Sequence, residues 1–158
     1  MHMPNDLYLE AMRAKGAADA ADFQQRSAEM DGTQMYEEEE KIPDFSEAVK
    51  IKNMLERQTG FICKSSAGRI VKLIQPYDSN IYTSEPEELP AQWGYYWSKD
   101  PRKALPFIAQ ATSPYMTGDC CTDAGHVWQA KQDNVVWAPS TNPEFWTDLG
   151  TIESVMGV

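Results

Sequence analysis

The first helical pattern spans residues 5–30, a stretch rich in Ala, Glu, Gln and Arg, all of which favour helix. Its apolar stripe is thin, with Leu9, Met12, Phe23 and Met30 as the main members. A helix with so few apolar positions is marginally stable alone. We therefore expect it to bundle with copies of itself or to dock on a partner, and a partly disordered arm is the alternative.

A break is expected over residues 31–43. Asp31-Gly32 is typical of a turn, and Glu37 to Glu40 is an acidic run that favours a solvated linker. A second helix is then predicted from Asp44, which can cap it, with Glu47 three residues on as in a capping box. It should end near Gln58.

The periodicity changes from Thr59 onwards. Two short β-prone runs, 61–63 and 69–74, flank a Ser-Ser-Ala-Gly turn, which predicts a β-hairpin. An aromatic cluster follows at 93–97, where Trp and Tyr could also make a subunit interface. Residues 98–114 carry three prolines and are expected to be a connection.

An internal repeat relates residues 59–97 to residues 117–149. In both copies a Thr-Gly turn leads through a cysteine and an Ala-Gly turn into a strand, and a Pro-x-x-Trp motif closes the copy. The matched elements are Thr59-Gly60 with Thr117-Gly118, Cys63 with Cys121, Ala67-Gly68 with Ala124-Gly125, Tyr82 with Trp137, and Pro90–Trp93 with Pro143–Trp146. The pattern favours a duplicated unit of roughly 35 to 40 residues.

The predicted fold class is therefore α+β, with an N-terminal helical segment followed by two small antiparallel β modules in tandem. The expected boundaries are a helical attachment region with its acidic linker at 1–57, a degenerate β module at 58–97, a linker at 98–114 and a better-preserved β module at 115–150.

Composition narrows the function classes. The net charge of -10 over 158 residues disfavours binding to nucleic acid or to an anionic membrane surface, because both carry negative charge. No apolar run approaches the roughly 20 residues that a membrane span needs. The first ten residues lack a basic stretch followed by an apolar core, so no Sec signal is expected there.

The candidate chemistry is that of binding, and no catalytic residue, metal site or cofactor is predicted. Three cysteines make a poor disulfide framework, and Cys120 and Cys121 should point to opposite faces of a strand. Buried free thiols are expected. Asp119 should accept backbone N–H groups in its turn. A polysaccharide-degrading enzyme needs paired carboxylates, and the aspartates of 119–148 are explained as turn or surface residues.

The second copy resembles the small chitin-binding modules of carbohydrate-binding families 5 and 12. The resemblance rests on Tyr115-x-x-Gly118-Asp119, Gly125-x-x-Trp128, Trp137-Ala138-Pro139-Ser140 and Pro143-x-x-Trp146. The first copy is similar in its second half, but Phe61 follows Gly60 where the family has a polar residue. The resemblance implies sugar binding through exposed aromatic side chains.

The candidate carbohydrate-binding residues are Trp137, Trp146, Tyr115, Trp128 and Tyr82. Trp137 stands in a loop and could stack on the C–H face of a sugar ring, or it could cover a thin core. Trp146 could instead pack in the core, and Trp128 could face either way. If one module binds sugar, we expect it to be the C-terminal one, at Trp137.

The arrangement of an N-terminal helix, an acidic linker and such modules also looks like small tail or baseplate accessory proteins of bacteriophages. That resemblance implies a virion protein made in the bacterial host cytoplasm and extracellular after release. Its expected partners are host-surface polysaccharide and virion structural proteins, and a homo-oligomer, favoured as a trimer, would add avidity. A structural adaptor or decoration protein, and a secreted chitin-binding accessory module, remain alternatives.

Overall fold

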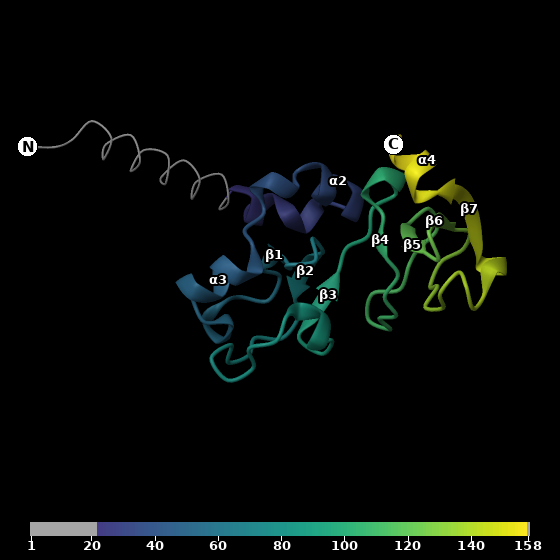
Figure 1. Cartoon of the computed structure of the whole chain (residues 1–158). Helices are drawn as coiled ribbons and strands as arrows, with labels where there is room; N and C mark the ends of the chain where they lie inside the picture. The colour runs from purple at the N-terminus through teal and green to yellow at the C-terminus, as the bar shows by residue number, and fades with distance from the viewer. Residues whose placement is uncertain (1–21, 158) are drawn as a thin grey trace, which may run out of the picture.

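The computed structural model describes residues 22–157, and the fold is α+β (Figure 1). Short helical elements come first, and two small sheets follow, as predicted. The first sheet has the order β1-β2-β3, and the second has the order β4-β5-β6-β7. Neighbouring strands are antiparallel except β4 and β5, which are parallel, a pairing the sequence pattern did not predict.

The helical region consists of short pieces. Residues 22–26 are helical, and five short elements follow: η1 (Ser27–Glu29), α2 (Gly32–Glu37), η2 (Glu39–Lys41), α3 (Phe45–Ile51) and η3 (Met54–Glu56). The helix predicted over 5–30 is thus helical at its described end, and its remainder lies outside the described residues. The predicted start of α3 after Asp44 is confirmed, although the Asp44 side chain makes no capping hydrogen bond.

The prediction of a solvated linker over residues 31–43 is wrong, because α2 and η2 lie within this range. Asp31 caps α2 in a full capping box with Gln34, whose side chain accepts from the Asp31 N–H at 2.9 Å. Met35 and Tyr36 are buried, and with Phe23 they pack on Ile62 and Ile70 of the first sheet. The sequence presents the two apolar residues as a short pair between polar runs, so the helical period is not visible.

The first sheet comprises β1 (Ile62–Lys64), β2 (Ile70–Leu73) and β3 (Trp93–Tyr95), with η4 (Pro86–Glu88) in the loop before β3. The predicted hairpin at 61–74 is confirmed, with Cys63 opposite Val71. Its turn includes Gly68 at φ 84°, a left-handed conformation that favours glycine. The outer edge of β1 is closed, because the Gln24 side chain bonds both the N–H and the C=O of Ile62 at 2.9 and 2.8 Å.

The second sheet comprises β4 (Leu105–Pro106), β5 (Cys120–Asp123), β6 (His126–Ala130) and β7 (Trp146–Thr151). Two 3-10 helices, η5 (Pro101–Lys103) and η6 (Pro143–Phe145), precede β4 and β7, and α4 (Ile152–Met156) packs beyond β7. The expected linker at 98–114 thus supplies an edge strand. Buried Arg69 donates a hydrogen bond to the Pro106 carbonyl and so ties β4 to the first sheet.

The hydrogen-bond registers of the two sheets correspond at several positions. The Gly60 N–H donates to Leu73 O at 2.8 Å, and the Gly118 N–H donates to Ala130 O at 2.9 Å. The reverse bonds, Leu73 N–H to Phe61 O and Ala130 N–H to Asp119 O, also correspond. Cys63 faces Val71 as Cys121 faces Trp128, and Trp93 faces Leu73 as Trp146 faces Ala130.

The two sheets share one core. Trp97, which follows β3, lies between two tyrosines: its ring centroid is 5.5 Å from that of Tyr95 and 4.2 Å from that of Tyr115, both in stacked geometry. Trp146 of the second sheet meets Tyr115 edge-on at 5.3 Å. An aromatic layer therefore runs from one sheet to the other, and burial of these rings supplies much of the apolar area that neither short sheet could bury alone.

Candidate functional site

The most exposed tryptophan side chain of the second sheet is Trp137, in the loop between β6 and β7. Its exposed fraction is 47%, so it is available to a ligand. Its ring lies 5.5 Å from the half-buried Phe145 ring at an interplanar angle of 36°. We call these two rings the Trp137–Phe145 platform. It offers a rigid apolar surface of the kind that stacks on the C–H face of a sugar.

The loop that carries the platform is held by hydrogen bonds at several points. Trp146 Nε1 donates to the Trp137 carbonyl at 2.9 Å, and the Ser140 N–H donates to Asp123 Oδ2 at 2.9 Å. The N–H groups of Thr141 and Asn142 both bond the Ala138 carbonyl. A loop ordered before a ligand arrives loses less conformational entropy on binding.

Polar side chains border the platform. Asn142 Nδ2 donates to Glu144 Oε1 at 3.2 Å; Asn142 is the N-cap of η6, and Glu144 lies within it, next to Phe145. The Glu144 carboxyl accepts hydrogen bonds from the Glu144 backbone N–H and from the Asn142 side-chain amide, and these bonds lower its pKa. An ionised carboxylate and an amide so placed can exchange hydrogen bonds with the hydroxyl groups of a neutral sugar.

Trp128, the mid-strand candidate, is half-buried on β6. Its indole Nε1 donates to the Asp123 carbonyl at 3.0 Å, so its polar edge is already bonded within the protein. Its ring lies 6.1 Å from His126, whose Nδ1 is 2.9 Å from Asp148 Oδ1. The hydrogen bond from His126 lowers the pKa of Asp148. Trp128 is thus only partly exposed, because it also packs against the shared core.

The prediction that Tyr115 and Trp146 contact a sugar is wrong, because both side chains are buried. Their exposed fractions are 1% and 2%, and both rings belong to the shared aromatic layer. Trp146 acts on the site through its indole N–H, which fixes the Trp137 carbonyl. A ring buried this completely cannot stack on a sugar unless the core opens.

Tyr82 is exposed at 57% and lies in the loop between β2 and β3 of the first sheet. The internal repeat matches it with Trp137, in the loop between β6 and β7. These two exposed aromatic residues therefore belong to loops of different sheets.

Phe145 is a platform residue that the sequence pattern did not identify. It is the last residue of η6, directly before Trp146, and it is half-buried against the shared core. The sequence offers no periodic signal for it, because the chain changes there from a 3-10 helix to a strand.

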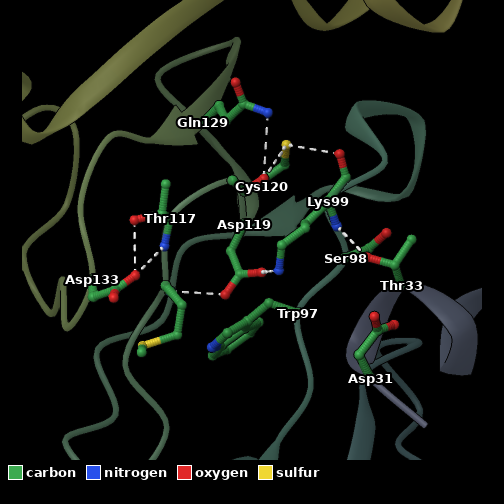
Figure 2. Close-up of polar contacts among 12 residues, drawn as sticks. Asp31, Thr33, Trp97, Ser98, Lys99, Thr117, Asp119, Cys120, Gln129 and Asp133 are labelled. Atoms are coloured by element: carbon green, nitrogen blue, oxygen red, sulfur yellow. Dashed lines mark hydrogen bonds and ion pairs between the residues drawn. The ribbon is translucent and has the colours of Figure 1, made fainter.

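The turn before β5 holds Asp119 as the sequence predicts. Asp119 is buried, and its carboxylate accepts the Met116 N–H at 2.8 Å and approaches Lys99 Nζ at 3.3 Å (Figure 2). Burial raises the pKa of Asp119, although Lys99 opposes this effect. Figure 2 also shows Thr117 bonded to Asp133 beside this turn. These bonds brace the turn.

The cysteines are buried free thiols, as expected, and Cys120 and Cys121 belong to clusters on opposite faces of β5. Burial raises the pKa of the Cys120 thiol to about 12. Within residues 22–157, no three His, Cys, Asp or Glu side chains gather as a metal site would require. None of the helices in this part of the chain is long and apolar enough to cross a membrane.

Comparison of the chain with protein-family models, with curated proteins and with solved structures finds no match. Any function must therefore be inferred from the residues of this chain.

Proposed function

We propose that the protein binds polysaccharide through the Trp137–Phe145 platform, as an accessory protein of a phage-type virion that attaches to a host surface. The observation that carries the proposal is the exposure of Trp137 at 47% in a loop that backbone and side-chain hydrogen bonds already hold. The virion location rests on the arrangement of the chain. One such platform binds weakly, so a homo-oligomer, with a trimer favoured, would supply avidity.

The experiment is a titration of the full chain with neutral β-1,4-linked N-acetylglucosamine oligomers, followed by tryptophan fluorescence and calorimetry. Trp137→Ala should weaken binding by about tenfold or more, because an aromatic contact surface is lost. Tyr82→Ala removes the exposed aromatic of the first sheet and is the matched control, which should bind as the wild type does. Equal loss in both variants, or no binding by the wild type across a glycan array, would overturn the proposal.

A second candidate function is that of a structural adaptor in the particle. Large apolar side chains stand exposed on two neighbouring segments, one from the end of α3 through η3 and the other between β2 and β3: Ile51, Leu55, Ile81 and Tyr82. These segments are joined by hydrogen bonds from Asn53 to Asp78 and from the Met54 N–H to Ser79. Exposed apolar patches often mark protein contacts. Cross-linking in purified particles would detect a virion protein at this patch.

A further inference from the structure

A cleft of about 620 Å³ lies beside the first sheet. Its walls are residues of the helical stretch 24–28, the segment 52–61 and the side chains of Lys72 and Tyr96. Its volume is in the range of small-molecule sites. Phe61 and Tyr96 supply aromatic surface within it.

The charge in this cleft is opposite to that of the whole chain. Lys52, Arg57 and Lys72 line it together with one carboxylate, that of Glu56, although the net charge of the protein is -10. None of these three cations takes part in an ion pair among residues 22–157. Among the residues that the structure describes, cations therefore outnumber carboxylates in the lining of this cleft.

Arg57 is the most constrained of the three cations. Its Nη2 donates to the Ala48 carbonyl at 3.0 Å, and its guanidinium lies 4.3 Å from the centroid of the Phe61 ring. Its Nε is buried without a hydrogen-bond partner, and burial lowers the pKa of this side chain. Residues 22–157 hold this guanidinium in place, and no carboxylate among them forms an ion pair with it.

The equivalent turn of the second sheet shows what is missing. There Lys99 packs over Gly118, 3.3 Å from where a Cβ would stand, and its Nζ pairs with Asp119. In the first sheet Phe61 takes the register position of Asp119, and the space beside Gly60 is open. The second turn therefore carries its own carboxylate beside Lys99, whereas in the first turn Phe61 stands at that position.

We propose that this cleft is a second binding site, which takes a carboxylate-bearing sugar such as a uronic acid unit of an acidic polysaccharide. The ligand carboxylate lies in the open space beside Gly60, near Arg57, Lys52 and Lys72. The sugar ring lies against Phe61 and Tyr96. The choice of a sugar rests on the proposed function, whereas the charge and the open space do not.

The test is a titration of the full chain with digalacturonic acid, with its dimethyl ester as a neutral ligand of the same rings. Calorimetry gives the affinity, and changes in backbone NMR chemical shifts locate the binding site. The acid should perturb residues around Arg57 and Phe61, weaken as ionic strength rises, and bind about tenfold more tightly than the ester. Equal affinity of acid and ester would overturn the proposal.

Two exposed lysines provide a variant that should still fold. Lys52→Gln with Lys72→Gln should weaken binding of the acid by about tenfold, because two charged donors are lost. Lys50→Gln with Arg102→Gln removes the same charge outside the cleft and should leave binding unchanged. Equal effects of the two double variants would show a general effect of net charge and would contradict the site.

Two further ligands distinguish an acidic sugar from an acidic peptide and from a simple anion. A tetraglutamate peptide that binds more tightly than digalacturonic acid, or inorganic phosphate that binds as tightly, would overturn the sugar assignment. Trp137→Ala should keep the affinity for digalacturonic acid, and the cleft double variant should keep the affinity for neutral oligomers. Binding of the acid without binding of neutral oligomers would support the cleft and contradict the proposed function. Binding of neutral oligomers without binding of the acid would support the proposed function and contradict the cleft.

Discussion

The hydroxyl of Tyr36 stands within the β2–β3 ladder. It accepts the Ile70 N–H at 3.1 Å and donates to the Tyr96 carbonyl at 3.1 Å, while the Tyr96 N–H bonds Ile70 O directly. One phenol thus completes a backbone pair and fastens α2 to the first sheet.

Tyr36→Phe should lower the free energy of unfolding by about 1–3 kcal/mol, because it leaves a buried N–H and a buried carbonyl without partners. Tyr95→Phe is the matched control, since the Tyr95 hydroxyl is buried and has no partner to lose. Urea unfolding of both variants checks this. A Tyr95→Phe loss as large as that of Tyr36→Phe would show that the hydroxyl bonds of Tyr36 are not the cause.

At the scale of the element, α2 is placed by a close backbone approach. A Cβ on Gly32 would lie 1.9 Å from the Trp97 carbonyl oxygen, and the Lys99 N–H donates to Thr33 Oγ1 at 2.9 Å beside it. Figure 2 shows Thr33 reaching this bond from the helix. The helix start and the chain between the sheets are thus in direct contact.

Gly32→Ala therefore sets two effects against each other. Helix propensity alone favours alanine by about 1 kcal/mol. The clash is with backbone, which no side-chain rotation relieves, and overpacking of this kind costs about 1–3 kcal/mol or more. We expect a net loss of stability in thermal unfolding. Glu37→Ala, an exposed change in the same helix, should be nearly neutral. A more stable Gly32→Ala protein would contradict this placement of α2.

The elements differ in how far the sequence could predict them. The hairpins follow from local signals, since Gly68 and Gly125 both adopt positive φ, at 84° and 81°, between short apolar runs.

The candidate site could be predicted only in part: Trp137 is exposed, but Tyr115 and Trp146 are buried. Both faces of β5 and β6 are covered, so the polar-apolar alternation that separates an outer from an inner face is lost. The depth of an aromatic residue then depends on distant partners such as Trp97.

At the scale of the whole molecule, burial of tyrosine links the core to pH. Burial raises the pKa of Tyr36 and of Tyr95 to about 12, and it also raises the pKa of Tyr77, Tyr96 and Tyr115. The unfolded chain releases these protons near pH 10. Between pH 10 and 12 the folded state therefore holds more protons than the unfolded state, and its stability must fall as pH rises.

We predict that the free energy of unfolding falls steeply as the pH rises above about 10. Each tyrosine whose pKa is raised by burial contributes at most about 1.4 kcal/mol per pH unit to this fall. Tyr95→Phe should retain neutral-pH stability but show a shallower decline, because one proton of the difference is removed. Tyr36→Phe should have a lower free energy of unfolding at neutral pH, and this free energy should also fall less steeply as the pH rises. Urea unfolding at several pH values, with the absorbance of tyrosinate recorded in parallel, measures both quantities. If the slopes of all three proteins were equal, Tyr36 and Tyr95 would ionise alike in the folded and unfolded chains, and burial of these two phenols could not be the cause of the alkaline loss of stability.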